Sequence, residues 1–509
     1  MTEESWLLEA EPYDPLTAAV APVYLAKRTT FFGAADAAAP DRTYRGWLTQ
    51  ALSTTRSMFD GGLAGGIGGN SLPSIAAAAL TVGDEFAAER VKFKRYRWAG
   101  RAVRIFQGVR GQPRSAYVQR FDGYVAAQPA FETGRVAIPL GDLQAKFDAP
   151  FQAATYAGTG GFAGGTDLKG QHKPDGVGVV RAAPVTWVDQ NAGWADVCAS
   201  GFHTVYAVRD GGNPLVEDAG NPPAAGKYYV DKPNGRLRFG SLPTFGYTVD
   251  FRSSFGGNAT TVGAICAAAA TSRLGFAAGQ VDAAGFAGVD TARPWAAGFM
   301  ALNGTTHREM WDYLLGGALC FYTTTPTGLL TAGAVKAPAA TGRTHPSVSR
   351  VITDRDIVPG TFKRAAFAAP PHTINVLARR NWTPLTDDRL AALAPQADKD
   401  FARQAWRTVP KANAATAAEF PLSVPLEWPS PFDDLTDAGL FGDIARDLLT
   451  VPRAPAEATL AIAPFGVKLG DEVWIESAVN EVNAPAIVAR VDENEAEHRV
   501  RLGLYALTE

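Results

Sequence analysis

The segment YAGTGGFAGGTDLKGQHKP, Tyr156 to Pro174, separates two β-rich parts of the chain and contains six glycines around Lys169. A phosphate-binding loop would need a Lys-Ser or Lys-Thr pair opening a helix, because the N-terminal amides of that helix face the anion. Here Gly170 follows Lys169, and the segment continues as a loop through Pro174. We therefore interpret the segment as a long connection, in which glycine permits positive φ and close backbone approach.

Length and charge restrict the possible classes of protein. The 509 residues exceed one hydrophobic core, so we expect about three or four domains. The chain has 48 Lys and Arg against 51 Asp and Glu, a net charge of −3, whereas a duplex-binding protein normally shows a clear basic excess. A protein that only surrounds a DNA passage would also lack that excess, since phosphate contacts would retain the DNA.

The cysteines and the first residues indicate where the chain is made. Cys198, Cys266 and Cys320 are far apart and form no C-x-x-C pair, so we expect reduced thiols in a chain made in the cytoplasm. An iron–sulfur cluster needs about four thiolates, so we predict no stoichiometric iron and no other metal or cofactor. The acidic start MTEESWLLEAEPYD is unlike a signal peptide, and no apolar run is long enough to span a membrane.

The residues before the glycine-rich segment predict a β-barrel or sandwich, because short apolar runs alternate with turn residues. The predicted strands cover residues 23–30, 43–51, 90–96, 102–109, 116–126 and 133–139. The run VKFKRYR, residues 91–97, places Lys92 and Lys94 on the solvated side of an edge strand. Ser57 to Gly69 is predicted as a turn-rich loop.

The residues after the glycine-rich segment continue the β pattern. Strands are predicted over 176–184 and 202–210, and Asn234-Gly235 predicts a type I′ hairpin within 228–252. Asp231, Asp250 and Arg252 are candidates for a catalytic group. Carboxylates on strands are more often solvent-facing or paired with a neighbouring arginine, and we favour that interpretation.

The central residues predict a small α+β domain. A helix is predicted over 260–274, and Thr306 with Glu309 has the form of a capping box that opens a second helix. A hairpin is predicted over 321–331. His307 has no second ligand one turn away, so a metal site is not expected there.

The last part of the chain predicts helices over 386–406 and 433–449, followed by strands that end at 491 and resume at 499, with Asp492 to Glu495 as the turn. The predicted fold class is therefore mostly β and multidomain (α+β), with β-barrel or sandwich domains at both ends and a smaller α+β domain between them. The predicted domains are 1–150, 151–259, 260–350 and 351–509.

Four blocks of sequence, in order, resemble the tail-tip or baseplate hub of long-tailed non-contractile phages, prophages and gene transfer particles. They are the glycine-rich segment with PDGVGVVRAAPVTWVD after it, the segments 239–243 and 248–252, the run INVLARRNW from Ile374, and the closing LGDEVWIES with its later strands. A fifth pattern of these proteins lies at Ser57 to Gly62. The chain departs from the family at Gln404 to Trp406, where acidic and tyrosine residues are more usual.

The resemblance implies a structural protein of the virion, a hub that joins the tail tube to the receptor-binding apparatus and surrounds the DNA exit channel. It implies a homotrimer beneath a hexameric distal tail ring, with the tail tube and the tail fibre or receptor-binding proteins as further partners. Genomic DNA would pass without specific binding, through a lumen that is neutral or acidic. No hydrolase elbow, zincin or Walker motif occurs in the sequence, and we expect no catalytic residues.

Two further expectations concern surfaces. A carbohydrate-binding or adhesion module is the alternative function, because 11 tryptophans could supply stacking surfaces. Trp6, Trp187, Trp194, Trp382 and Trp406 are not clustered in the sequence, which disfavours that alternative. The glycine-rich segment is predicted to lie at a domain or subunit junction.

Overall fold

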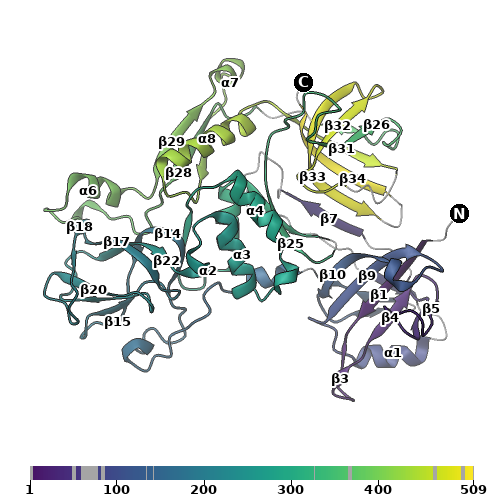
Figure 1. Cartoon of the computed structure of the whole chain (residues 1–509), viewed down its shortest axis with the longest axis horizontal. Helices are drawn as coiled ribbons and strands as arrows, with labels where there is room; N and C mark the ends of the chain where they lie inside the picture. Colours follow the sequence, from purple (N-terminus) through teal and green to yellow (C-terminus); the bar gives the residue numbers. More distant parts are fainter. Residues whose placement is uncertain are drawn as a thin grey trace.

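The computed structural model describes residues 4–48, 53–58, 78–81, 86–132, 135–141, 143–325, 327–364, 369–461, 467–494 and 499–507. The chain is mostly β with several separate sheets, which confirms the predicted β-rich class. In Figure 1 the first sheets lie at the lower right and a second β-rich part lies at the left, with helices between them. The last sheet lies at the upper right, beside the first part. Most of the predicted loop at Ser57 to Gly69 is outside the described residues.

The N-terminal part is built on a five-stranded antiparallel sheet with the order β13-β10-β9-β1-β4. Its strands are β1 (Glu4–Ala10), β4 (Val23–Ala26), β9 (Ala102–Val109), β10 (Val118–Val125) and β13 (Leu140–Gly141). A three-stranded sheet of β8 (Ala78–Thr81), β11 (Ala130–Glu132) and β12 (Arg135–Ile138), and a hairpin of β5 (Thr30–Phe32) and β6 (Arg42–Tyr44), accompany it. Alternate side chains such as Leu8 and Ile105 form its core.

The strand predicted over residues 90–96 is wrong, because residues 90–95 belong to the helix α1 (Phe86–Arg95). Phe93 and Tyr96 are buried three positions apart and pack near Trp98, which is a helical spacing. Lys92 pairs with Glu89 at 2.8 Å across one turn. The alternation of VKFKRYR fits both structures in a short window, and the packing of Phe93 decides between them.

The second β-rich part contains two five-stranded sheets packed on one core, with the orders β18-β17-β22-β14-β23 and β15-β16-β21-β20-β19. Its strands are β14 (Asp175–Pro184), β15 (Thr186–Asp189), β16 (Trp194–Asp196), β17 (Phe202–Asp210), β18 (Asn213–Pro214), β19 (Val216–Glu217), β20 (Lys227–Asp231), β21 (Arg236–Phe239), β22 (Tyr247–Ser253) and β23 (Gly298–Ala301). The strands predicted over 176–184 and 202–210 are confirmed. The predicted type I′ turn is wrong, because Asp231 pairs with Arg236 across a four-residue loop in which only Gly235 has positive φ.

Helices occupy the centre of the molecule, as Figure 1 shows in teal. They are α2 (Phe255–Asn258), α3 (Val262–Ser272), α4 (Ala283–Ala292) and α5 (His307–Trp311). The predicted helix over 260–274 and the capping box of Thr306 and Glu309 are confirmed. The predicted hairpin is also present, formed by β24 (Cys320–Thr324) and β25 (Leu330–Ala334). The helix α4 was not predicted.

The helix predicted over 386–406 is wrong. Its residues form a single 3₁₀ turn at Asp387–Arg389 and the helix α6 (Gln396–Arg403), with Pro395 at the N-cap of α6. Proline cannot donate the backbone hydrogen bond that a helix interior needs, so the two segments stay separate. The strand β28 (Thr373–Ala378), which precedes α6, forms a sheet with β29 (Arg407–Ala412) and β30 (Leu426–Pro429), and α7 (Ala414–Glu419) lies between these last two in the chain. The helix predicted over 433–449 is confirmed as α8 (Leu435–Leu449), which packs on that sheet.

The last sheet has seven strands and includes one from the N-terminal part of the chain. Its path is β26 (Val348–Thr353), β32 (Glu472–Ser477), β33 (Val482–Asn494), β34 (Arg499–Leu507), β31 (Ala454–Leu460) and β27 (Lys363–Arg364). The strand β7 (Ser53–Ser57) pairs with the end of β33, with Ser57 opposite Arg490. The predicted turn at 492–495 is wrong, since β33 runs through Asn494 and the next residues are outside the described part. None of the described helices is long and apolar enough to cross a membrane.

Candidate functional site

The glycine-rich segment is a closed loop that packs on the second β-rich part. Near its base the Tyr156 amide donates to the Gln171 carbonyl and the Gly170 amide donates to the Tyr156 carbonyl, beside an isolated bridge between Thr155 and His172. Phe162 packs edge-on against Trp194 at 5.3 Å. Five of the six glycines have positive φ, as expected for the predicted connection: Gly158, Gly160, Gly161, Gly164 and Gly170. No helix begins after Lys169, so the segment lacks the geometry of a phosphate-binding loop.

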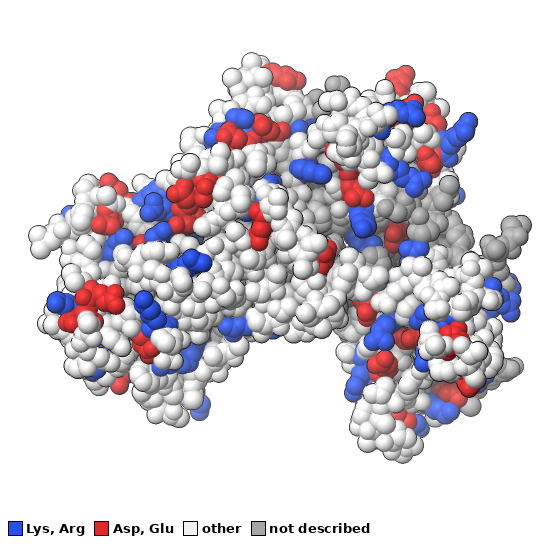
Figure 2. Space-filling model, in the orientation of Figure 1, with Lys and Arg blue, Asp and Glu red and all other residues white. Residues whose placement is uncertain are grey.

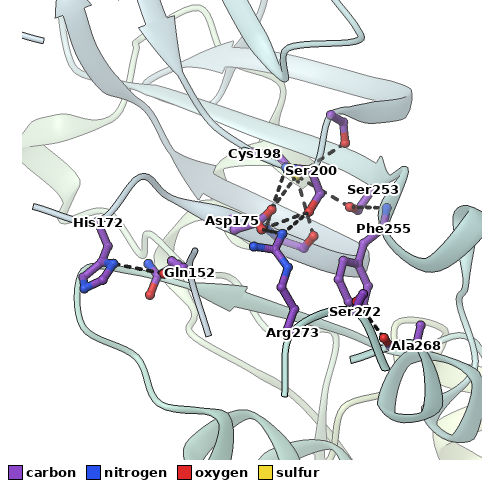
Figure 3. A network of polar contacts seen from close by, with 12 residues as sticks. Gln152, His172, Asp175, Cys198, Ser200, Ser253, Phe255, Ala268, Ser272 and Arg273 are labelled. Atoms are coloured by element: carbon purple, nitrogen blue, oxygen red, sulfur yellow. Dashed lines mark hydrogen bonds and ion pairs between the residues drawn. The ribbon is translucent and has the colours of Figure 1, made fainter. Parts of the chain in front are cut away.

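A buried polar network joins β14 to the end of α3, as Figure 3 shows. The Asp175 carboxylate, which has no exposed area, accepts hydrogen bonds from the Ser200 amide at 2.9 Å and the Ser200 hydroxyl at 2.9 Å. Arg273 pairs with the same carboxylate at 2.9 Å. The Cys198 thiol donates to Asp175 at 3.4 Å. Every oxygen of Asp175 therefore has a partner.

This network resembles a nucleophile with an acidic neighbour, but its chemistry does not suit catalysis. Burial, and then the Asp175 charge, raise the pKa of the Cys198 thiol, so the thiolate is disfavoured. The histidine drawn nearest in Figure 3, His172, contacts the Gln152 carbonyl rather than the thiol. Burial raises the pKa of Asp175, and the Arg273 charge opposes that shift. The network is best described as a closed link between the β-rich part and the central helices.

A second cluster of charges lies where the blocks of sequence meet. Arg181, in the block that follows the glycine-rich segment, makes two hydrogen bonds to Asp433 at 2.8 and 2.6 Å and lies 3.6 Å from Asp250. Asp250 also pairs with Arg209 at 2.9 Å. Asp250 is therefore a buried, paired carboxylate, as favoured from the sequence. Asp231 lies elsewhere and accepts from Asn234, and Arg252 donates to the Asn258 carbonyl.

The block Arg379-Arg380-Asn381-Trp382 places four side chains in four environments at the same junction. Arg379 lines a cleft with Arg209 and Asp250. Arg380 stacks over Trp382 at 3.7 Å. Asn381 is buried and donates to two carbonyls at the end of α6, those of Phe401 and Ala402. The Trp382 amide donates to the Arg181 carbonyl at 3.2 Å, which joins this block to the earlier one.

The other residues considered from the sequence are mostly packed into the structure. His307 is buried against Phe151, with an orphaned Nδ1. The three cysteines are buried and free, and no group of three or more metal-binding side chains gathers within the described residues. Trp6 is in the N-terminal core, whereas Trp187, Trp194, Trp382 and Trp406 pack against other aromatic rings. These tryptophans do not line one common surface.

The surface in Figure 2 carries basic and acidic side chains in mixture, with no broad field of one sign on the visible face. That mixture agrees with the net charge of −3 over the whole chain. It offers no continuous basic track for a nucleic acid on this face.

No protein-family model matches the chain, and no curated protein matches it. Solved structures do match it. The 43 kDa tail protein of prophage MuSo2 from Shewanella oneidensis is 11% identical, with a TM-score of 0.35, over 99% of this chain and 98% of that one. A chain of the native gene transfer agent virion is 11% identical, with a TM-score of 0.44, over 67% of this chain and 85% of that one. Prophage tail protein gp18 from Listeria monocytogenes is 6% identical, with a TM-score of 0.37, over 98% and 94%. The first and third of these structures are named as prophage tail proteins, and the second comes from a gene transfer agent particle.

Proposed function

We propose that this chain is a structural component of a phage tail tip or baseplate, a hub that joins the tail tube to the receptor-binding apparatus around the DNA exit channel. One observation carries the proposal: blocks of sequence that resemble the hub family, although far apart in the chain, contact one another in the fold. Arg181, Asp250 and Trp382 belong to three different blocks and meet at one junction. Residues that a family retains for its architecture would be expected at such a junction.

The arrangement of β-rich parts supports a ring of three chains. The N-terminal sheets and the last sheet are two separate β units, which we take to be barrel-like or sandwich-like, and β7 connects them. Three chains would supply six such units and could meet a sixfold tail tube without leaving half of the contacts unmade. A closed ring would also cover exposed sheet edges. The proposed domains remain 1–150, 151–259, 260–350 and 351–509.

The proposed role is structural and not enzymatic. The buried Cys198 and Asp175 have neighbours that neutralise or disfavour their reactive forms. We propose a location in the virion tail tip, with the distal tail ring, the tail tube and the tail fibres or receptor-binding proteins as neighbours. Genomic DNA would pass a lumen lined by neutral or acidic side chains, because basic contacts would resist its movement.

A cryo-EM reconstruction of the intact tail end tests this proposal. We expect three copies of this chain in one ring between the tail tube and the host-facing proteins. Six copies in a ring, a single central copy, or a lumen lined mainly by Lys and Arg would contradict it. Binding of the isolated chain to a glycan array, with no incorporation into particles, would instead favour the carbohydrate-binding alternative.

A further inference from the structure

The junction between the second β-rich part and α6 contains an open cleft of about 250 Å³. Side chains from four elements and from the residue that follows β28 line it. They are Arg209 of β17, Asp250 of β22, Arg379 after β28, Ala397, Asp398 and Phe401 of α6, and Arg407 of β29. The cleft thus has three arginines and two aspartates on its walls. The lining residues therefore carry one more positive than negative charge.

The two aspartates are already engaged by the same arginine. Arg209 pairs with Asp250 at 2.9 Å and with Asp398 at 2.9 Å. Within the described part of the chain, Arg379 and Arg407 have no carboxylate at ion-pair distance. Arg407 donates to the Gln404 side chain at 2.6 Å, and the Asp400 charge acts on it without forming an ion pair. Both guanidiniums lie near the ring of Phe401, at 5.8 Å for Arg379 and 5.0 Å for Arg407.

Arg379 is unusual in its backbone and in its side chain. Its φ is +48°, a left-handed conformation that a residue with a side chain rarely adopts. Its Nε is buried and donates no hydrogen bond to the described residues. A strained residue that holds a buried donor without a partner is typical of a site that is completed by a ligand. Burial, and then the nearby Arg379 charge, lower the pKa of Arg407, while the Asp400 charge opposes that shift.

We infer that this cleft binds a single carboxylate, presented by an aspartate or glutamate side chain of a neighbouring protein chain. The carboxylate would accept hydrogen bonds from Arg379 and Arg407. Guanidinium groups offer this anion a positive charge and donors in the geometry that it prefers. An excess of one positive charge suits one carboxylate, whereas a nucleic acid requires a track of several basic residues. Leu393, four residues before the lining residue Ala397, is 89% exposed, and we expect it to contact the residues beside that carboxylate. This inference does not depend on the tail-tip assignment.

Titration of the purified full-length chain tests the inference. The protein is labelled with ¹⁵N-arginine, and the Nε–H resonances of Arg379 and Arg407 are assigned by their loss in Arg379→Gly and Arg407→Gln. The probe is N-acetylglutamate methylamide, which has one carboxylate. We expect both resonances to shift saturably. In each variant, the resonance of the remaining arginine should report binding of the probe that is at least about tenfold weaker, since one of the two arginines that bind the carboxylate is missing.

Glycine is chosen at position 379 because it adopts positive φ without strain, so this variant should fold. Arg343→Ala is the matched control, since Arg343 is 61% exposed and pairs with Glu476 in another part of the molecule. It removes one arginine and should leave the titration unchanged. A shift that is equal in sodium chloride at the same ionic strength, or no saturable shift, would overturn the inference.

Two further probes identify the source of the anion. A five-residue peptide with a central glutamate between leucines should bind more tightly than the single amino acid derivative, because the surrounding surface contributes. Equal binding of both would contradict a protein partner. Tighter binding of inorganic phosphate or of a short single-stranded oligodeoxynucleotide would contradict a carboxylate site.

Discussion

The Asp175 network and the Arg379 cleft are both clusters of charge at the edges of the second β-rich part, but only the first is complete. Asp175 is fully buried, and each of its oxygens has a donor from Ser200, Cys198 or Arg273. In the cleft, Arg209 pairs with both aspartates, while Arg379 and Arg407 line it without an ion-pair partner among the described residues. A closed network of this kind holds elements together, whereas donors left without acceptors indicate where another molecule binds.

The largest expected effect comes from opening the closed network. Arg273→Ala leaves the Asp175 carboxylate buried without its ion-pair partner, and removal of one partner of a buried pair costs about 3 to 5 kcal/mol. We expect urea unfolding of the full chain to show a loss of this size. Arg343→Ala, at an exposed pair, should change the free energy of unfolding by less than about 1 kcal/mol. Equal effects of the two variants would show that the network does not hold the parts together.

The next largest expected effect is a loss of folding stability in acid, through His307, whose pKa is affected by Arg273 of the closed network. Burial, and then the Arg273 charge, lower the pKa of His307 to about 4. Because the unfolded chain binds that proton near pH 6.5, stability is complete above about pH 6.5 and falls as the pH drops toward 4, by at most about 3 kcal/mol. His307→Gln should remove this part of the pH dependence, measured as unfolding free energy between pH 4 and 7. The control His203→Gln, at an exposed histidine, should keep it.

A smaller loss is expected at the pairs that lie beside the cleft. Arg181→Lys keeps the charge but cannot make both hydrogen bonds to Asp433, so we expect a loss of about 1 to 2 kcal/mol. Thermal unfolding would show it as a lowered Tm. Carboxylate binding in the cleft should persist, because Arg181 is not among the residues that line it. Loss of carboxylate binding in this variant would mean that the Arg181 pairs and the cleft form one site.

The smallest effect on the free energy of unfolding is expected for Arg379 in the cleft. Arg379→Gly removes a charge that has no ion-pair partner and relieves the left-handed backbone, so stability should stay equal or rise by up to about 1 kcal/mol. Arg379→Ala keeps the strain and should be the less stable of the two variants. A large loss in both, measured by urea unfolding, would show that Arg379 is a structural residue rather than a free donor.

The sequence predicted the parts of the fold that depend on local signals. The capping box at Thr306 and Glu309 and the pattern over residues 260–274 identified helices, since each signal lies within a short stretch of sequence. Prediction failed where local patterns were ambiguous, as in VKFKRYR. The broken helix around Pro395 had a visible signal, the proline itself, which outweighs the helix-forming residues on either side.

The two charge clusters could not be predicted, because their members are far apart in the sequence. Asp175 and Arg273 are separated by 98 positions, and Arg181 and Asp433 by 252. The run Arg379 to Trp382 was recognised as part of a family block, but nothing in the run indicates which arginine stacks on tryptophan and which faces the cleft. That distinction arises from the positive φ of Arg379 and from the position of α6.

The pairing of β7 with β33 has a consequence for the order of events during synthesis. Ser57 leaves the ribosome long before Arg490, its partner 433 positions later. At about 5 to 20 residues per second, the interval is roughly 20 to 90 s. During that time β7 has no sheet to join, and its unpaired backbone can pair with another nascent chain. Correct assembly of this protein therefore depends on keeping one early strand unoccupied until the last strands arrive.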